Sequence, residues 1–462
     1  MTTTSLIYLV ELGGNTRKNP DLSGTIHNVF GIQVGVSINL FIKLPKRPRK
    51  PRAIINYHAV PREWRREEKY QFLEKAETIA GVKWQRLTPD KKNNWLTNPT
   101  DEVFESFLPL GSKSAKANKA GSGAAIFKLF SLGVVTNRDK LVHDFDCEKL
   151  GKKVQTFIDL YNAAVERNLA EKRSKNADSL IDVTDARIKW TRQTKASLER
   201  CQRSKYCKRL IRETLYRPFA KRWLYFDPFW NEEQYKQATI FPTPDTENAV
   251  ICVSTSNERP FTALATNTVP NLVAAGGFGA GTQCFPLYIY SENGEERHDN
   301  IPRSTLDRVI IQYDDNTITR ADIFHYVYAV LHHPEYRTRY AENLKRELPR
   351  IPFAPDFRSF AKAGAKLAEM HMFYEKQKEY RLRRIENKDT PLDWRVEAMK
   401  LSKEGDALVY NEHFTFAGIP PDVHEYKLGN RSALDWVIDQ YRVTRDEEGN
   451  IVSDPNRDED EQ

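Results

Sequence analysis

The chain has 462 residues, 40% of them hydrophobic and 29% charged, with a formal net charge of +8. This composition excludes an intrinsically disordered protein and predicts a folded chain of two to four domains, at roughly 150 residues per domain. The basic excess favours a polyanionic partner. Five cysteines are present, but no pair has the Cys-x-x-Cys spacing of a zinc site, so we expect free thiols in a reducing cytoplasm.

Neither a signal peptide nor a membrane span is expected. No basic region precedes the first apolar run, and Glu11 interrupts that run. The apolar stretch Val29–Leu44 contains Gly31, Gln33 and Asn39, which makes it too short and too polar to cross a bilayer. We therefore expect a cytoplasmic protein with no membrane partner.

Strands are predicted near the N-terminus at Ser5–Leu12, Val29–Leu44 and Ile54–His58, with a break in the second at Gly31 or Gly35. Two strands alone are marginally stable in water, and their open edges would invite aggregation. We therefore predict that residues 1–60 are the terminal strands of a larger sheet whose first part lies outside this chain.

Residues 61–125 are predicted to form a connector. Glu63–Ala80 has the periodicity of an amphipathic helix. Gly111–Gly123 is small, polar and basic, and is predicted to be a mobile loop. Just before the connector, Lys43–Arg52 combines basic residues with prolines, so it cannot be helical. It either grips a phosphate backbone or is a solvated linker, and the sequence leaves both interpretations open.

From residue 126 the pattern mixes long helices with short strands. Helices are predicted at Glu148–Arg173, Ala186–Tyr216, Ala321–Leu348, Phe360–Arg384 and Ser432–Tyr441. Strands are predicted at Asn248–Ser254, Thr262–Thr266, Cys284–Tyr290, Val309–Gln312 and Glu425–Leu428. The acidic tail from Asp446 to Gln462 is expected to be loose.

The most informative stretch is Tyr216–Asp227, which reads Tyr-Arg-Pro-Phe-Ala-Lys-Arg-Trp-Leu-Tyr-Phe-Asp. Pro218 blocks a continuous helix there. The basic residues Arg217, Lys221 and Arg222 are of the kind that meets phosphates or guanine edges, and the interleaved aromatics offer flat faces to bases. Aromatics at this spacing also pack protein cores, so the block has a structural interpretation beside the functional one.

A series of blocks resembles type ISP restriction–modification enzymes, the single-chain relatives of Type I systems. The blocks are Ile7–Asn15, Ser23–Val36, Gly133–Asp139, Arg217–Asp227, Cys284–Tyr288, Asp322–His332 and Tyr426–Tyr441. Each block is modest by itself, but their number and order make the resemblance specific from residue 5 to about residue 457.

The resemblance implies the end of an N6-adenine DNA methyltransferase domain in residues 1–60 and a target-recognition, or specificity, domain in residues 126–455. Residues 456–462 would form an acidic tail. The implied fold class is mixed α/β and α+β: terminal strands of a Rossmann-like methyltransferase sheet, then an α+β domain with long helices. The implied function is sequence-specific recognition of double-stranded DNA.

The resemblance also suggests site residues. By analogy, Phe30 would stack on a flipped adenine, because a base must leave the duplex to be methylated. A core aromatic beside a hinge is the alternative for Phe30. The candidates for DNA contact are Asn137, Arg138, Arg217, Lys221, Arg222, Lys427 and Arg431. Blocks shared across a family whose members read different bases are expected to be scaffold, which favours phosphate contacts over base contacts for these residues.

No catalytic residue is predicted in this chain. Adenine methyltransferases clamp the target nitrogen with an Asp/Asn-Pro-Pro-Tyr tetrapeptide, whereas Pro420-Pro421 lies within Ile-Pro-Pro-Asp. The glycine cluster Gly276–Gly281 precedes a strand-like run and not a helix that would hold an anion. Neither an ATP-binding P-loop nor metal-ligand spacing of histidines is present. The chain alone is expected to bind no cofactor, while the complete enzyme would use S-adenosylmethionine, and ATP with Mg²⁺ for its motor.

Three hypotheses therefore remain. In the first, the chain is the specificity portion of a type ISP enzyme, as a fragment or as the product of a split gene, inactive by itself. In the second, it is a complete methyltransferase with a divergent cofactor loop at Gly276–Gly281. In the third, it is an interaction subunit whose first strands complete the sheet of a separately encoded N-terminal half.

Overall fold

The computed structural model describes residues 6–15, 25–43, 53–89, 95–96, 101–112, 125–170, 177–179, 181, 187–255, 259–276, 281–291, 293–389 and 391–456. Most of the predicted basic run Lys43–Arg52, most of the loop Gly111–Gly123 and the end of the acidic tail lie outside these residues. The chain divides into two compact units, Met1–Val103 and Phe104–Gln462.

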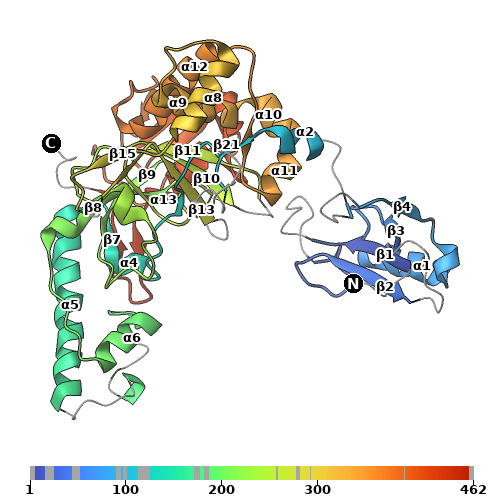
Figure 1. The fold of residues 1–462 in the computed structure, drawn as a ribbon. Coiled ribbons are helices and arrows are strands. Elements are labelled where there is room, and N and C mark those ends of the chain that lie inside the picture. The colour runs from blue at the N-terminus through green and yellow to red at the C-terminus, as the bar shows by residue number, and fades with distance from the viewer. Residues whose placement is uncertain are drawn as a thin grey trace. The chain divides into compact units, whose positions relative to one another are not determined.

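The N-terminal unit is a four-stranded sheet in the order β2-β1-β3-β4, accompanied by helix α1 (Figure 1). Its elements are β1 (Leu6–Gly13), β2 (Val36–Ile42), β3 (Ile54–Ala59), α1 (Arg66–Ala76), a 3-10 turn (Ile79–Gly81) and β4 (Gln85–Leu87). Strand β1 runs antiparallel to β2 and parallel to β3. The second predicted strand is shorter than expected, because Asn28–Gly35 forms a turn and the strand begins at Val36.

This unit extends past residue 60, where the expected methyltransferase-like segment ends. Its core contains Val10 and Leu12 from β1, and Phe72 and Leu73 from α1 pack against them. Strand β4 adds to the sheet by pairing with β3. The predicted connector helix is therefore part of the N-terminal unit.

Two four-stranded sheets form the centre of the second unit, in the orders β11-β10-β13-β6 and β12-β8-β9-β7. Their strands are β6 (Ser131–Leu132), β7 (His143–Asp144), β8 (Ile211–Arg217), β9 (Ala220–Tyr225), β10 (Val250–Thr255), β11 (Ala263–Thr266), β12 (Val269–Pro270) and β13 (Gly281–Pro286). Strand β10 is buried on both faces, since Ile251 and Val253 belong to one core cluster and Val250 and Cys252 to the other. The alternation follows from the two-residue period of a strand.

The first of these core clusters lies between the β10 sheet and a layer of helices. These are α8 (Arg303–Tyr313), α9 (Arg320–His332), α10 (Pro334–Arg339), α11 (Ala341–Arg346) and α12 (Phe357–Met372), with α2 (Asp101–Ser106) beside them (Figure 1). Thr319 and Asp322 form a reciprocal capping box at the start of α9. Helices α9 and α12 approach closely at Gly364, where a Cβ would stand 1.9 Å from the carbonyl oxygen of His325.

The second core cluster packs helix α5 against strands β8 and β9. The elements of this region are α4 (Asp139–Val142), α5 (Cys147–Ala170), a short 3-10 turn (Ala177–Ser179), α6 (Arg192–Glu199), a second 3-10 turn (Lys208–Leu210) and α7 (Gln237–Ile240). In Figure 1, α5 and α6 extend from the sheets as an arm.

In the second unit, four predicted elements are wrong in type or extent. The helix predicted over Ala186–Tyr216 is only the eight-residue α6, and an irregular segment and a 3-10 turn lead from it to strand β8. The strand predicted at Val309–Gln312 lies inside helix α8. The long helix predicted at Ala321–Leu348 breaks at His333, because Pro334 cannot continue the α9 hydrogen bonds. The helix predicted to Arg384 ends at Met372.

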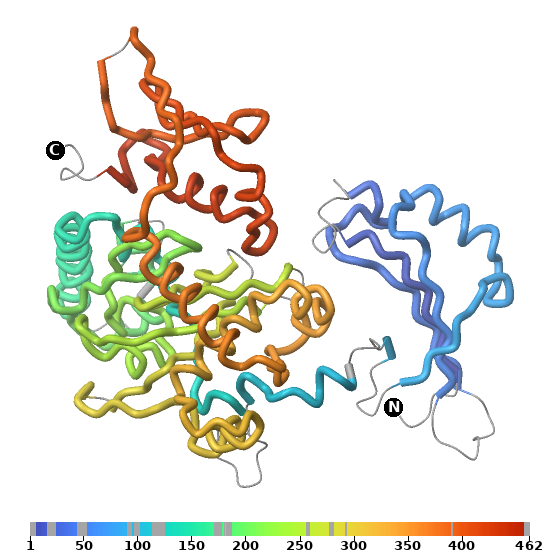
Figure 2. Tube along the Cα trace, turned by 90° about the horizontal axis from the view of Figure 1, so that it is seen from above, coloured from blue at the N-terminus to red at the C-terminus, as the bar shows by residue number. Residues whose placement is uncertain are grey.

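The C-terminal segment forms a small four-stranded sheet, in the order β17-β20-β19-β18, followed by two hairpins and a helix (Figure 2). Its elements are β17 (Arg383–Glu386), β18 (Lys400–Leu401), β19 (Ala407–Val409), β20 (Phe414–Ala417), β21 (Lys427–Leu428), β22 (Arg431–Ser432), α13 (Ala433–Gln440), β23 (Thr444–Arg445) and β24 (Ile451–Ser453). The remaining short strands of the unit pair as β14 (Tyr288–Tyr290) with β15 (Arg297–Asp299), and β16 (Arg350–Ile351) with β5 (Leu108–Pro109).

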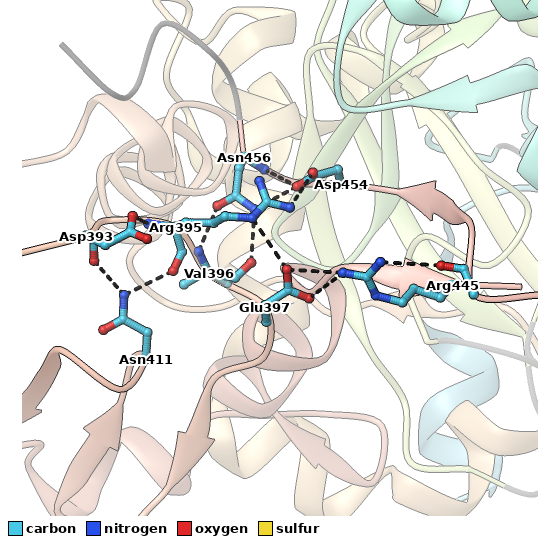
Figure 3. A network of polar contacts seen from close by, with 9 residues as sticks. Asp393, Arg395, Val396, Glu397, Asn411, Arg445, Asp454 and Asn456 are labelled. Atoms are coloured by element: carbon cyan, nitrogen blue, oxygen red, sulfur yellow. Dashed lines mark hydrogen bonds and ion pairs between the residues drawn. The ribbon is translucent and has the colours of Figure 1, made fainter. Parts of the chain in front are cut away.

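The tail from Asp446 is not loose as far as Asn456. Figure 3 shows the polar network that holds it: Asp454 accepts a 2.9 Å hydrogen bond from Arg395, and Asn456 bonds the backbone of Val396 in both directions. Arg445 adds an ion pair with Glu397 at 3.2 Å. Residues 445–456 are thus tied to the loop that precedes β18.

No helix in the described part of the chain is both long and apolar enough to cross a membrane.

Candidate nucleic-acid interface

The basic–aromatic block is a β-hairpin. Strands β8 and β9 pair in antiparallel register up to Arg217 and Ala220, and Pro218 and Phe219 form the turn. Phe219 takes a positive φ of 53°. Its ring stands edge-on to His371 and Tyr374, with centroid separations of 5.4 Å. The hairpin tip therefore packs into the body of the domain and does not present its aromatic ring to a ligand.

Arg222, on β9, lies between two aromatic rings. Its guanidinium carbon is 4.3 Å from the ring centroid of Phe145 and 4.3 Å from that of Tyr216. Burial lowers the pKa of the guanidinium from its usual value, although the group remains protonated at neutral pH. A cation held between two rings in this way stabilises the fold by cation–π attraction.

Lys221 is also engaged inside the domain. Its ammonium lies 3.6 Å from carboxylate oxygens of both Glu213 and Glu375, and its side chain is only 12% exposed. The same ammonium is 5.6 Å from the ring centroid of Tyr374. Two carboxylates and a ring already satisfy this cation, which makes it a weak candidate for phosphate contact.

Arg217 joins the hairpin to two distant segments. It donates hydrogen bonds to the backbone oxygen of Tyr216 at 2.7 Å and to the side-chain oxygen of Asn271 at 3.2 Å. A weaker contact of 3.4 Å reaches the carboxylate of Asp139. Burial raises the pKa of Asp139, but the Thr136 and Tyr216 hydroxyls that donate to it and the charge of Arg217 outweigh burial, so the pKa lies below its usual range. Asp139 is therefore an anion that holds Arg217 and the Tyr216 hydroxyl in place.

Arg138, a sequence candidate for DNA contact, is engaged inside the domain. It is only 2% exposed and donates hydrogen bonds to the carbonyl of Trp230 and to the hydroxyl of Thr191. Its guanidinium carbon also lies 5.3 Å from the Trp230 ring centroid. Burial lowers its pKa to about 10, so it stays charged at neutral pH. Arg138 ties the base of α6 to Trp230, and these contacts favour a structural role over contact with DNA.

The hollow beside the hairpin is where several candidates meet. It has a volume of about 780 Å³, and its polar lining residues are Thr136, Asn137, Arg138, Asp139, Lys140, Lys189, Thr191, Arg217 and Asn271. Asn137 is exposed and takes a positive φ of 54°, which suits asparagine better than most residues. Of the sequence candidates in this hollow, Asn137 is the one whose side chain is open to solvent.

The structure places the remaining specificity-domain candidates elsewhere. Lys427 is exposed on β21. Arg431, on β22, forms an ion pair with Asp439 at 3.3 Å and stands 4.8 Å from the ring centroid of Trp436. These two residues do not line the hollow beside the hairpin.

Sequence reasoning missed four polar residues of the hollow that lie outside the sequence blocks: Lys140, Lys189, Thr191 and Asn271. Lys140 follows the Gly133–Asp139 block directly, so proximity in sequence was an available signal. Asn271 is brought to the hollow by the pairing of β12 with β8. No local pattern marks that pairing, because it joins residues more than fifty positions apart.

Phe30 lies in the N-terminal unit on a firmly held turn. The buried side chain of Asn28 donates hydrogen bonds to the carbonyls of Gly14 and Val34 and accepts one from the amide of Phe30 at 2.9 Å. Tyr70 of α1 bonds the carbonyl of the residue before Phe30 at 2.7 Å. The Phe30 ring is 72% exposed. A rigid backbone thus presents an aromatic ring to solvent, which fits base stacking better than the alternative of a core aromatic.

The described residues do not fit an S-adenosylmethionine cradle. Of the glycine cluster Gly276–Gly281, the structure describes Gly276 and Gly281. Gly281 is the first residue of strand β13, so a strand and not a helix N-terminus follows the cluster. Pro420 and Pro421 open a short 3-10 turn in Ile-Pro-Pro-Asp. In the same described residues, no group of three His, Cys, Asp or Glu side chains is arranged to hold a metal ion.

A family model described as the Type ISP C-terminal specificity domain matches residues 125–462. Among curated proteins no match is found. A cryo-EM structure of a DrdV–DNA complex shares 36% identity, with a TM-score of 0.77, over 96% of this chain and 44% of that one.

Two further solved structures are type ISP enzymes. A nuclease-deletion mutant of LlaGI with a DNA substrate mimic shares 28% identity, with a TM-score of 0.78, over 98% of this chain and 41% of that one. The ATP-dependent enzyme LlaBIII bound to DNA shares 26% identity, with a TM-score of 0.81, over 98% of this chain and 29% of that one. The chain thus spans less than half the length of these relatives.

Proposed function

We propose, from the premise that this chain belongs to the Type ISP C-terminal specificity domain family, that it recognises a target sequence in double-stranded DNA. The observation that carries the proposal is the family match over residues 125–462, together with relatives of similar fold that were solved as DNA complexes. In this role the chain supplies recognition, and methyl transfer to adenine belongs to a larger assembly in the cytoplasm.

The N-terminal unit would act at the methylation site. Phe30 is exposed on a turn held by buried hydrogen bonds, so its ring is free to stack on an extruded base without rearrangement of the backbone. The complete enzyme would use S-adenosylmethionine for the transfer and ATP with Mg²⁺ for its motor.

Selection of binding sites from a pool of randomised duplexes tests the proposal. We expect successive rounds to enrich one short sequence. The enriched duplex should then bind at least about 10³-fold more tightly than random DNA, as specific recognition usually does. Affinity for both should fall steeply with salt, because bound phosphates release counterions. Weak binding to every duplex, with no enriched sequence, would contradict target recognition.

Titration calorimetry with S-adenosylmethionine separates this function from that of a complete methyltransferase with a divergent loop after Gly276. The proposed function predicts no heat of binding to the chain alone. Micromolar binding would show that a cofactor pocket exists and would overturn the assignment of the chemistry to another part of the assembly.

A second candidate function is supported by the edge of the N-terminal sheet. Strand β2 is an edge strand of the described sheet, and its side chains Ile38, Leu40 and Phe41 are 37%, 42% and 53% exposed. An exposed apolar edge strand is a site where another chain can add to the sheet. Co-purification of the chain with a separately expressed N-terminal half of a type ISP methyltransferase would support this role. Elution of the two as separate monomers would count against it.

A further inference from the structure

The basic character of the chain is concentrated in one segment. Residues 187–212 contain ten Lys or Arg residues and one Glu, a net charge of 10 − 1 = +9. This exceeds the +8 of the whole chain. The rest of the chain is therefore close to neutral. A polyanionic partner inferred from the overall charge would be attracted mainly to this segment.

The second half of this segment, residues 200–209, lies along helix α5. The side-chain amide of Asn168 donates to the carbonyl of Leu198 near one end of the helix. Closer to the other end, Lys208 pairs with Glu148 at 2.9 Å. Residues 200–209, which we call the return segment, thus run antiparallel to α5. The helix has 24 residues and is about 36 Å long at 1.5 Å per residue.

Specific hydrogen bonds fix the return segment to the helix. Asn162 and Ser204 exchange two, at 2.8 and 3.0 Å. The Tyr161 hydroxyl donates to the carbonyl of Gln202 at 2.8 Å. The indole N–H of Trp230 donates to the Ser204 hydroxyl at 2.8 Å, which links the segment to the buried core. The backbone that carries the basic side chains is therefore held in a defined path.

The basic side chains of the return segment point away from the core. Arg200, Lys205 and Arg209 are exposed, and no ion pair links any of them to an acidic group of the described residues. Two further cations are in exposed ion pairs, Arg203 with Glu166 and Lys208 with Glu148. Such exposed pairs contribute little to stability, so the cations can exchange a carboxylate for a phosphate at small cost.

We propose that the return segment is a phosphate-binding rail that lies along the backbone of the DNA on which the domain acts. This inference rests on the proposed function. The cations extend over most of the length of α5, and that length is close to the roughly 34–36 Å of one helical turn of DNA. The partner is the DNA backbone and not the base edges, because an exposed row of Lys and Arg along a helix matches the regular line of charge that phosphates present.

Neutralising the rail tests this inference. The rail variant is Arg200→Gln/Lys205→Gln/Arg209→Gln. The control, Lys362→Gln/Lys366→Gln/Lys378→Gln, removes the same charge from exposed lysines on α12 and just beyond it. Fluorescence anisotropy with a labelled random duplex of about 30 base pairs, at roughly 50 to 300 mM KCl, gives the slope of log K against log salt.

We expect the rail variant to lower the magnitude of this slope by about 2.7, since each lost phosphate contact removes about 0.9. Its affinity near 0.1 M salt should fall on the order of 100-fold, equally for target and random duplexes. The control should change affinity less than about threefold, through the general loss of charge. The charge-conserving variant Arg200→Lys/Arg209→Lys should keep the wild-type slope.

The outcomes separate the rail from the function on which it rests. If the wild-type chain binds no DNA at all, the proposed function fails. If the wild-type chain binds DNA but the rail and control variants have equal slopes, the rail inference is overturned and the function stands. Unchanged melting temperatures of both variants would show that the differences come from binding, as expected for substitutions of exposed side chains.

Discussion

Two neighbouring basic regions of this domain use their cations in opposite ways. In the hairpin of β8 and β9, Arg222 lies between two rings and Lys221 meets two carboxylates. In the return segment, Arg200, Lys205 and Arg209 face solvent. Aromatic residues interleaved with basic ones in a buried strand therefore indicate internal cation–π packing. Basic residues on the exposed return segment are the ones available to a polyanion.

The comparison first predicts that a buried cation matters for folding and an exposed one does not. Arg138→Ala should lower the free energy of unfolding by about 3 kcal/mol, because it leaves buried carbonyls without donors and opens a cavity beside Trp230. Urea unfolding at neutral pH measures the change. The matched substitution Arg209→Ala should stay within about 0.5 kcal/mol. Equal changes in the free energy of unfolding for the two substitutions would contradict the difference between the two regions.

The hairpin region should also be the pH-sensitive one. His143 is buried beside the Tyr216 ring, and among the described residues neither of its ring nitrogens has a hydrogen-bond partner. Burial lowers its pKa to about 3. The Asp139 carboxylate favours protonation, but burial and the charges of Arg222 and Arg217 outweigh it. The folded state therefore keeps His143 neutral at pH values where the unfolded state protonates it, so stability is complete above pH 6.5 and is lost as pH falls toward 3.

The titration of His143 alone should make the free energy of unfolding about 2 kcal/mol lower at pH 5 than at pH 8. In the His143→Leu variant, unfolding between about pH 4 and 6 should take up roughly one proton fewer than in the wild type. Urea titrations across this range give the proton uptake from the slope of stability against pH. Ile311→Leu, at a 79% exposed position, is the control and should leave the slope unchanged because it removes no titratable group. An unchanged slope for His143→Leu would show that the ring is solvated.

Aromatic side chains also divide into those packed inside the protein and those exposed to solvent. Phe219 packs edge-on against other rings, whereas Phe30 is 72% exposed. Phe30→Ala should change the free energy of unfolding by less than about 0.5 kcal/mol. In the complete enzyme it should weaken binding to a duplex with an extruded adenine by about 1–3 kcal/mol, the usual contribution of one stacked base. Unchanged affinity and methylation would remove Phe30 from the site.

Much of the fold follows from local pattern. The strands at Leu6–Gly13, Ile54–Ala59 and Val250–Thr255, and the helix Cys147–Ala170, agree with the periodicity of their residues. The segment after α6 does not, because its extended path is set by hydrogen bonds from α5, such as the one from Tyr161. The short apolar run at Val309–Gln312 is compatible with either strand or helix, and its packing in the helical layer decides for helix.

The candidate site was less predictable than the fold. Arg138 and Arg200 carry the same charge, but Arg138 is buried and Arg200 is exposed. The burial of Arg138 depends on contacts with residues far along the chain, such as Trp230. The pairing of Arg217 with Asn271 likewise depends on strand topology and not on local sequence. Composition does locate the excess charge, and the structure is needed to show which of the cations are free.

Lysine footprinting of the unmodified chain, with and without duplex DNA, tests the central claim most directly. Acetylation of accessible lysines followed by mass spectrometry reports both regions in one experiment. We expect Lys205 and Lys208 to react in the free chain and to be protected by DNA. Lys221 should react slowly in both states because its side chain is only 12% exposed, and Lys362 should react equally in both. Protection confined to lysines outside the return segment would contradict it.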